Sequence, residues 1–508
     1  MAYERGTGMV QTYAAIAGAV LVLGKRTLTD LPTLLIALTT AIPPAPSARP
    51  VTWADLPSAL HARLEAGGIS SSAFAGFLDQ LNRTHAHRVR EGDLDHLVFY
   101  LLQSTHFTRV PPLEPALSAR AVVDALPPPD RAAYLQQGGG DIARVPAPVR
   151  TRARDLLRAL DSRDRDPRMV YFRQLAGIAL PKGGGRETAL LREYLRAMRF
   201  LYQKEFVAQR APDAADAVAS LYRTRGLSTD TAVEAGYLVH LGLGVVKSLE
   251  PGRRVRRVLI VGPGLDLAPR TALIDAAPPE SYQPWAVIDA LVGLGLARLD
   301  DLEVVAADIN PRVVDHLRRE RSAPPTLHLV SGLRQTAGLT LESDYREYFA
   351  LLGTAISASR EPVTESNGRL TKVVRVQPSA AQVITAAPLD IVTEQLQGAP
   401  FDLVIATNIL PYFDDVELAL AIGNIAAMLS PGGILLHNEP RPTLRALADA
   451  SCMPLEQSRQ APIARVAGAP PLADAIWIHR RVRSRTPSLC TAEWSRHRTH
   501  GTHLALHL

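Results

Sequence analysis

The sequence predicts a doubly wound, mostly parallel α/β domain in the C-terminal half of the chain, preceded by a mostly helical N-terminal domain. From Arg253 onward, short runs rich in Val, Ile and Leu alternate with helical stretches. Continuous apolar strands separated by helices are typical of a parallel sheet that is covered on both faces. Before that point, apolar residues recur at three- and four-residue steps, which is the period of an amphipathic helix.

The helical half is clearest near its end. One helix is expected from Glu187 to about Phe206, because its apolar residues share one face. A second is expected to begin after Ser228-Thr229-Asp230, which offers N-cap side chains, and to continue through Tyr237 to about Leu249.

The expected strands are short, apolar and bounded by turn residues. Two of them, Ile463–Val466 and Ala475–His479, flank the turn signal at 468–471 and predict a closing antiparallel hairpin. The strands before this hairpin are Val258–Val261, Val304–Ala307, Val383–Thr385, Leu403–Ala406 and Ile434–Leu436.

The two ends of the chain differ from its middle. Apolar stretches at 13–23 and 31–42 are each shorter than the roughly 20 residues of a membrane-spanning helix. The second lies between a positive flank and small residues, as in a secretory signal. Residues 1–50 are therefore a candidate signal or membrane anchor, and a cytoplasmic chain with an apolar first helix is the alternative. The basic tail, 483–508, is expected to be disordered, and without an aromatic ladder or nucleic-acid motif we expect no nucleic-acid partner.

A glycine turn follows the first expected strand, in the run VLIVGPGLD at 258–266. Gly262 allows a tight turn, and Gly264 allows close approach of a ligand to the backbone. A helix should follow, and the free N–H groups at its N-terminus favour an anion. A tight turn without a ligand is the alternative at this point.

Polar residues follow the next strands at the same edge of the sheet, where open α/β folds bind ligands. Asp308 ends the strand in VVAADINP at 304–311, where a carboxylate can accept two hydrogen bonds from a ribose diol; otherwise it caps the next helix. The run FDLVIATNILPYFD at 401–414 and the run MLSPGGILLHNE at 428–439 each combine a strand with a turn.

In this order, the glycine turn, the strand-end acid, the Phe-Asp-Leu-Val strand and the Leu-Ser-Pro-Gly-Gly turn resemble class I S-adenosylmethionine-dependent methyltransferases over about 253–482. The run from Thr407 to Asp414 looks most like the chemotaxis-receptor glutamate methyltransferases. The resemblance implies a seven-stranded Rossmann-like methyltransferase sheet and S-adenosyl-L-methionine as the cofactor. Together with the changes in composition along the chain, it predicts four parts: a segment 1–50, a helical domain 51–250, a methyltransferase domain 251–482 with insertions at 269–301 and 331–378, and the tail 483–508.

The resemblance also assigns roles to residues of this sequence. Tyr412 and Glu439 would face the site and position the acceptor. Two departures from the family are Ile260, where an acid is common, and Asp266, which replaces a third glycine and would hold the methionine amino group. The segment 228–237 would form a lid. The cofactor would contact Gly262, Pro263, Gly264, Asp266, Asp308, Ile309, Asp390, Ile391, Asn408 and Ile409.

Two other functions stay open. A nicotinamide-dependent oxidoreductase would need a third glycine, which this chain lacks, and an acid about 20 residues on, whereas Asp308 is much farther away. A binding or regulatory protein with a degenerate methyltransferase fold would share the same sheet. The acceptor, a small molecule or a protein carboxylate, hydroxyl or amine, is not identified by the sequence. We expect no metal site, because His85 and His87 look like part of a polar loop and the other clustered histidines lie in the tail.

Overall fold

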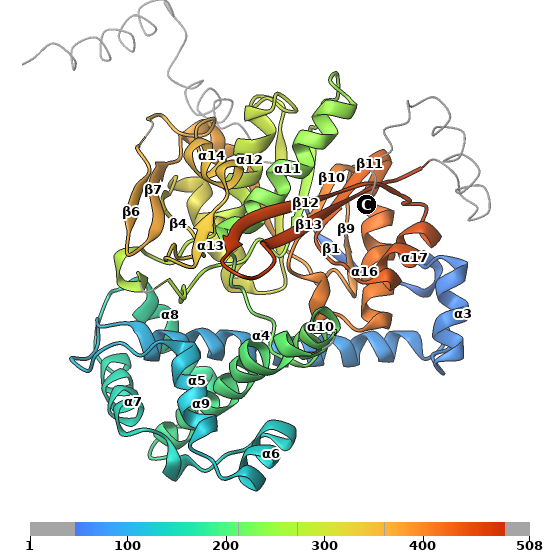
Figure 1. The fold of residues 1–508 in the computed structure, drawn as a ribbon. Helices are drawn as coiled ribbons and strands as arrows, with labels where there is room; N and C mark the ends of the chain where they lie inside the picture. The colour runs from blue at the N-terminus through green and yellow to red at the C-terminus, as the bar shows by residue number, and fades with distance from the viewer. Residues whose placement is uncertain (1–45, 212, 272, 360, 483–508) are drawn as a thin grey trace, which may run out of the picture. The chain divides into compact units, whose positions relative to one another are not determined.

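The computed structural model describes residues 46–482 except 212, 272 and 360 (Figure 1). The predictions made for residues 1–45, the apolar stretches, and for the basic tail fall outside the described residues. Within the described part of the chain, no helix combines the length and apolar character that crossing a membrane requires.

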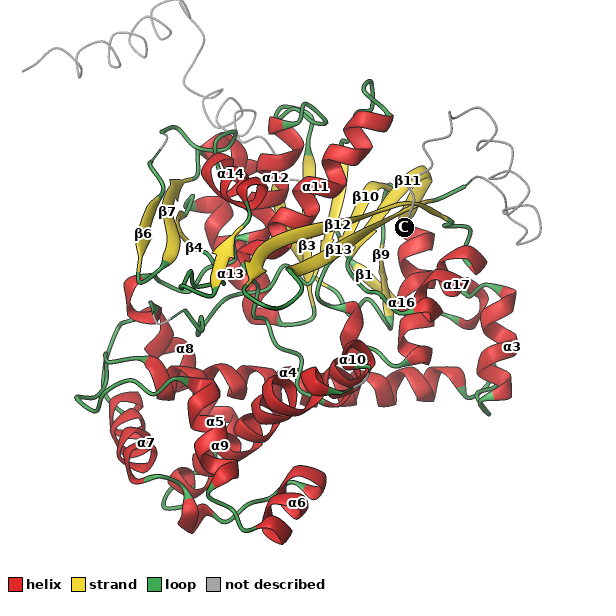
Figure 2. Cartoon of the chain, viewed as in Figure 1, coloured by secondary structure: helices red, strands yellow, loops and turns green. Residues whose placement is uncertain are grey.

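The centre of the fold is an eight-stranded mixed sheet in the order β5-β12-β13-β11-β10-β2-β3-β8 (Figures 1 and 2). Five neighbouring strands, β11, β10, β2, β3 and β8, run parallel, whereas β13 is antiparallel to both β11 and β12, and β5 is antiparallel to β12. Their bounds are β2 Arg257–Val261, β3 Glu303–Asp308, β5 Leu339–Leu341, β8 Ile384–Pro388, β10 Phe401–Ala406, β11 Leu429–His437, β12 Leu455–Val466 and β13 Leu472–Arg480.

The apolar strands are continuous because both faces of the sheet are covered. Along β2, Val258 and Ile260 belong to one hydrophobic cluster, and Leu259 and Val261 belong to another. This alternation follows from the two-residue period of a strand. The first cluster contains α11, α12 and α13, and the second contains α3, α16 and α17. The expected doubly wound α/β arrangement is therefore present.

The sheet has one strand more than the seven expected, because β5 from the 331–378 insertion pairs with the edge strand β12. The same insertion forms most of a three-stranded sheet of β4 (Thr326–Val330), β7 (Arg369–Arg375) and β6 (Thr364–Ser366). Near the start of the described chain, β1 (Ala48–Pro50) pairs with β9 (Glu394–Leu396).

The helical half is organised around α4, a helix of 30 residues that contacts α5, α7, α8 and α9. The expected helix at 187–206 is present as α9 (Arg186–Tyr202). The helices before the sheet are α3 Ser58–Ala66, α4 Phe74–Gln103, α5 Pro115–Asp124, α6 Pro128–Gln137, α7 Ala147–Leu160, α8 Pro167–Ala179, α9, α10 Ala214–Thr224 and α11 Val233–Leu249. Within the sheet region they are α12 Gln283–Gly293, α13 Pro311–Ser322, α14 Ser343–Leu351, α15 Pro378–Gln382, α16 Asp415–Met428 and α17 Pro442–Ala450.

Two local expectations were wrong. Helix α11 begins at Val233 after Ala232, and no side chain caps it, so Ser228-Thr229-Asp230 are not its N-cap. The helix after the glycine turn does not follow directly, because α12 begins only at Gln283. This apolar helix, which the sequence placed inside an insertion, packs on the sheet: its Trp285 and Ile288 are fully buried. The insertion predicted at 269–301 is therefore limited to the loop between Gly264 and α12.

Candidate functional site

A cavity of about 770 Å³, partly open to solvent, lies at the carboxyl ends of the parallel strands β2, β3, β8 and β10. We call it the first cavity. Ligands of open α/β folds bind at this edge of the sheet. Its walls come from the strand ends, from α4 and from the segment before α11. The lining residues are His85, Val89, Leu227–Thr231, Val261, Gly262, Gly264, Gln283, Asp308–Asn310, Leu389–Ile391, Thr407–Ile409, Tyr412 and Phe413.

Asp308 is a buried carboxyl group at the end of β3, and its side chain faces the first cavity. One carboxylate oxygen accepts from Asn310 N at 2.8 Å, and the other accepts from Gly264 N at 3.5 Å. No described cationic side chain forms an ion pair with it. Burial raises the pKa of Asp308 to about 7, against the effect of the two amides. The group therefore has acceptor capacity that a neutral donor could use.

The space that the glycine turn leaves free is filled by the protein itself. At Gly264, where φ is +75°, a Cβ atom would lie 2.0 Å from Thr231 Oγ1 and 2.6 Å from the Thr229 carbonyl oxygen. Thr229 is fixed there because its carbonyl accepts from Leu265 N and its hydroxyl donates to Leu265 O. At Gly262, a Cβ atom would meet Ile409 Cγ2 at 2.4 Å. Both glycines are thus required for close packing around the cavity.

The N-terminus of α12 also reaches the first cavity, although it lies far along the chain from the turn. Gln283 is buried, and its Nε2 donates to Thr407 Oγ1 at 2.7 Å. Both residues line the cavity. The following Pro284 occupies the first turn, where a missing N–H costs nothing.

Asp390 lines the cavity beyond β8, and its side chain is held by His85 of α4. His85 Nδ1 lies 2.6 Å from Asp390 Oδ2, and His85 Nε2 lies 2.9 Å from Glu417 Oε1 of α16. A carboxylate can only accept, so each ring nitrogen must carry a proton. Burial lowers the pKa of His85, but the hydrogen bonds to the two carboxylates outweigh it and raise the pKa to about 9. His85 is thus a buried imidazolium.

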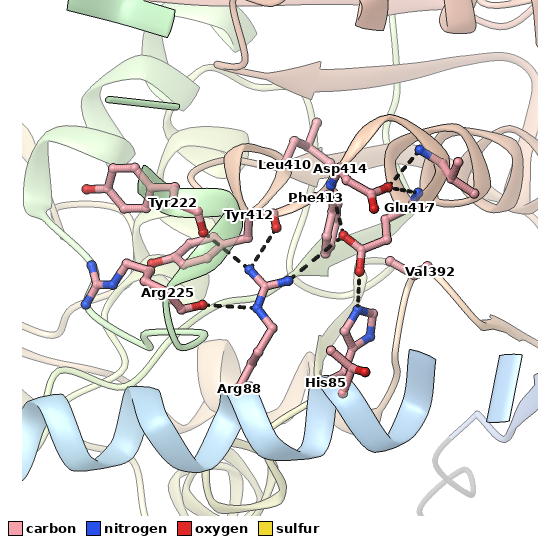
Figure 3. Close-up of polar contacts among 12 residues, drawn as sticks. His85, Arg88, Tyr222, Arg225, Val392, Leu410, Tyr412, Phe413, Asp414 and Glu417 are labelled. Carbon is pink, nitrogen blue, oxygen red and sulfur yellow. Dashed lines mark hydrogen bonds and ion pairs between the residues drawn. The ribbon is translucent and has the colours of Figure 1, made fainter. Parts of the chain in front are cut away.

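Arg88, one turn along α4, holds the loop after β10 in place. Its guanidinium donates to the carbonyl oxygens of Arg225, Tyr222 and Tyr412 at 3.0, 3.3 and 2.8 Å (Figure 3). Tyr412 is nearly buried and stacks edge-on against Tyr222, with ring centroids 5.3 Å apart. Burial raises the pKa of Tyr412 above its ordinary value. Its position on the cavity wall is therefore set by the helical half.

Asn408 shapes the wall on the β10 side. Its φ of 62° is unusual for a residue other than glycine. Asn438 fixes it in two ways, because Asn438 Oδ1 accepts from Asn408 N at 2.9 Å and Asn438 Nδ2 donates to Asn408 Oδ1 at 2.7 Å. This pair ties the ends of β10 and β11 together.

Most of the residues named from the sequence come together in the first cavity, and three do not line it: Pro263, Asp266 and Glu439. The Pro263 carbonyl accepts from Thr231 Oγ1 at 3.3 Å. Glu439 is buried against Arg441, whose guanidinium donates to the carbonyls of Leu410 and Phe413. These contacts give Glu439 a part in holding the loop around Tyr412. Asp266 lines a second, adjacent cavity, described below.

The sequence interpretation missed His85, Arg88, Asp230 and Gln283. His85 was placed in a polar loop, but it is buried in α4. Its carboxylate partners lie 305 and 332 residues along the chain, so no local pattern identifies it. Asp230 was interpreted as part of a helix cap. Arg88 lies in a strongly charged run of the same helix, 83–95, where nothing distinguishes it from its neighbours.

The sequence matches no family model and no curated protein. Among solved structures, the N-methyltransferase NodS from Bradyrhizobium japonicum WM9 is 15% identical with a TM-score of 0.26, and the alignment covers 49% of this chain and 98% of that chain. Magnesium protoporphyrin IX methyltransferase (ChlM) from Synechocystis PCC 6803 is 11% identical with a TM-score of 0.26, over 54% and 99% of the two chains. A TehB-like methyltransferase from Corynebacterium glutamicum is 12% identical with a TM-score of 0.25, and the alignment covers 54% of this chain and 100% of that chain. Similarity at this level does not bear on activity.

Proposed function

We propose that the protein is an S-adenosylmethionine-dependent methyltransferase of class I. One observation carries the proposal: a cavity at the carboxyl ends of a doubly wound sheet joins a glycine turn after β2 to a buried acid at the end of β3. Without β5, this sheet has seven strands and closes with the antiparallel hairpin β12–β13 that the resemblance implied. A nicotinamide enzyme is disfavoured by the lack of a third glycine.

The residues of the first cavity suit the cofactor. The carboxyl of Asp308 has spare acceptor capacity and no cationic partner among residues 46–482 that the structure describes, so the hydroxyl groups of a ribose are suitable donors for it. Ile309 and Ile391 would enclose the adenine, and Asp390 would face its amino group. Gly262, Asn408 and Ile409 would surround the methionine end. Asp390 can accept a further bond because each carboxylate oxygen has two lone pairs.

When bound, the cofactor supplies an electrophilic methyl group on a sulfonium. The task of the chain is to align the acceptor with that group and to exclude water. Tyr412 and Asn408 border the cavity on the side of β10, and Arg88 and Asn438 hold them there. Positioning by fixed side chains is what a direct displacement requires, and a base is needed only when the acceptor must lose a proton.

Calorimetric titration of the full chain with S-adenosylmethionine tests the proposal, with Asp308→Ala as the variant and the exposed Asp300→Ala as the matched control. We expect micromolar binding by the wild type and by Asp300→Ala, and at least tenfold weaker binding by Asp308→Ala. If a folded wild-type protein shows no binding, the proposal is wrong. Binding without transfer of a labelled methyl group to any acceptor would instead favour a degenerate, regulatory domain.

A further inference from the structure

A second, larger cavity of about 1600 Å³, open in part to solvent, adjoins the first. The two share a wall of Ser228, Asp230, Thr231, Asn408 and Tyr412. Beyond this shared wall, the second cavity is lined by the loop after the glycine turn, by the helical half and by β4. Its other residues include Arg168, Tyr222, Arg225, Asp266, Arg270, Glu280, Tyr282 and His328.

Buried polar groups in the second cavity lack hydrogen-bond partners among the described residues. Arg168 is 4% exposed and Tyr282 is 5% exposed, yet one terminal nitrogen of Arg168 and the hydroxyl of Tyr282 have no partner. Asp266 Oδ1 and Arg225 Nε are also buried without a hydrogen-bond partner among the described residues. A buried polar group that is left unpaired destabilises the folded protein, because it has lost its hydrogen bonds to water. Several such groups around one cavity therefore indicate a site built for a polar ligand.

The charges of the second cavity favour an anion. The carboxylate of Glu280 is already hydrogen-bonded within the protein, because it accepts from His328 N and lies 2.8 Å from His328 Nδ1. Within the described part of the chain, the guanidinium of Arg168 donates to two backbone carbonyls, those of Leu267 and Ala277, and to no side chain. Burial raises the pKa of Asp266 well above its ordinary value, which favours the neutral carboxyl.

Two arginines add to this positive field. Arg225 shares the carboxylate of Asp95 with Arg196, and Arg196 also pairs with Glu193. Arg270 is exposed and lies over the ring of Phe99. Burial tends to raise the pKa of Tyr222, but Lys204, Arg225 and Arg270 lower it below its ordinary value. The side of the cavity around Tyr222 is therefore net positive.

The shared wall carries one acid, Asp230. Its side chain is 30% exposed, and its Oδ1 lies 3.1 Å from Nδ1 of the fully buried His96. Burial tends to raise the pKa of Asp230, but His96, Arg270 and Arg225 hold it below its ordinary value, so the carboxylate is ionised. An ionised carboxylate at the junction attracts an N–H or O–H group and repels another carboxylate.

We propose that the second cavity binds the methyl acceptor, a small anionic molecule whose carboxylate or phosphate faces Arg168 and Arg270 and whose amine or hydroxyl nucleophile lies against Asp230. This inference rests on the proposed function. The lone pair of the nucleophile forms the new bond to the methyl carbon, the carbon–sulfur bond breaks, and its electron pair stays on the sulfur as a neutral thioether. The proton that the nucleophile loses passes to water in the solvent-open second cavity, and the ionised Asp230 orients the N–H or O–H group as a hydrogen-bond acceptor.

The test uses the full chain, methyl-labelled S-adenosylmethionine and an extract of the cells that naturally make the protein, separated by size. We expect label in the low-molecular-weight fraction, retained on an anion exchanger and stable to mild base. Methanol released by base would reveal a methyl ester, which means that the nucleophile is a carboxylate and not the proposed amine or hydroxyl. Label in macromolecules, or label that the exchanger does not retain, would overturn the acceptor class. No label at all, from protein that binds the cofactor, would count against the proposed function itself.

The variant Arg270→Ala tests whether the acceptor binds in the second cavity. Arg163→Ala is the control, because it removes an exposed positive charge outside both cavities. At limiting extract we expect roughly tenfold less label with Arg270→Ala and no change with Arg163→Ala, because only Arg270→Ala removes a charged hydrogen-bond donor to the acceptor. Affinity for S-adenosylhomocysteine should be unchanged in both. If Arg270→Ala weakens S-adenosylhomocysteine but not 5′-methylthioadenosine, which lacks the amino-acid end, the cavity holds the cofactor and the inference is overturned.

Discussion

Replacement of His85 by glutamine tests whether α4 is held to the sheet by a buried charge. The imidazolium lies between Asp390 and Glu417, and its pKa is raised from 6.5 to about 9. At about 1.36 kcal/mol for each pH unit, a shift of this size corresponds to roughly 3 kcal/mol. A group whose pKa is raised on folding stabilises the protein fully below the unfolded pKa. This stabilisation is therefore present below pH 6.5 and is lost as the pH rises toward 9.

The variant also leaves two carboxylates near each other without their shared cation. Breaking a buried ion pair by removing one partner costs about 3–5 kcal/mol. We expect His85→Gln to lower the free energy of unfolding by about that amount at pH 6.5. The variant should also lose most of the decline in the free energy of unfolding that we expect for the wild type between pH 6.5 and 9. Urea unfolding followed by circular dichroism at several pH values measures both effects.

His87→Gln is the matched control, because His87 lies on the same helix with its side chain 67% exposed and 3.9 Å from Glu91. It should change the free energy of unfolding by less than about 0.5 kcal/mol. A His85→Gln protein within 1 kcal/mol of the wild type, or one with the same pH dependence, would refute the buried imidazolium.

Three further predictions concern the first cavity. Because the pKa of Asp308 is about 7, cofactor affinity measured by calorimetry should rise roughly tenfold from pH 6 to pH 8, and Asp308→Asn should abolish that rise; a flat wild-type profile would contradict the role of the carboxylate. Gly264→Ala should lower stability by at least 1–3 kcal/mol in thermal or urea unfolding, because its Cβ would overlap Thr231, whereas Gly252→Ala, with open space around it, should be neutral. Hydrogen exchange should show that the cofactor protects the amides of residues 228–231 more than those of α9; equal protection would rule out a lid.

The sheet could be predicted from the sequence because its strands are buried on both faces. Runs such as Val258–Val261 are apolar without interruption, and only a covered parallel sheet explains several of them in succession. Asp308 and the glycine turn could be found for a related reason, since strand ends at one edge of such a sheet lie close together.

The remaining features depend on contacts between distant parts of the chain. In the small sheet of β4, β7 and β6, the strand β6 is exposed, and β4 and β7 alternate buried residues with less buried ones instead of forming continuous apolar runs. Tertiary context decides how such strands pair. His85 becomes a site residue only when α4 meets Asp390 and Glu417. Ser228-Thr229-Asp230 has the composition of a helix cap, and tertiary contacts with the glycine turn place it on the cavity wall instead.

One face of the sheet is covered by α3, α16 and α17, and this affects whether the two halves of the chain can fold separately. Leu56, Leu60 and Leu64, from the start of the described region, share one hydrophobic cluster with Leu418 and the rest of α16. A fragment beginning near Arg253 would expose that cluster and would lose the wall of the first cavity that α4 supplies. Removal of residues 46–103 would therefore take away part of the cavity wall together with the side chains that cover this face of the sheet.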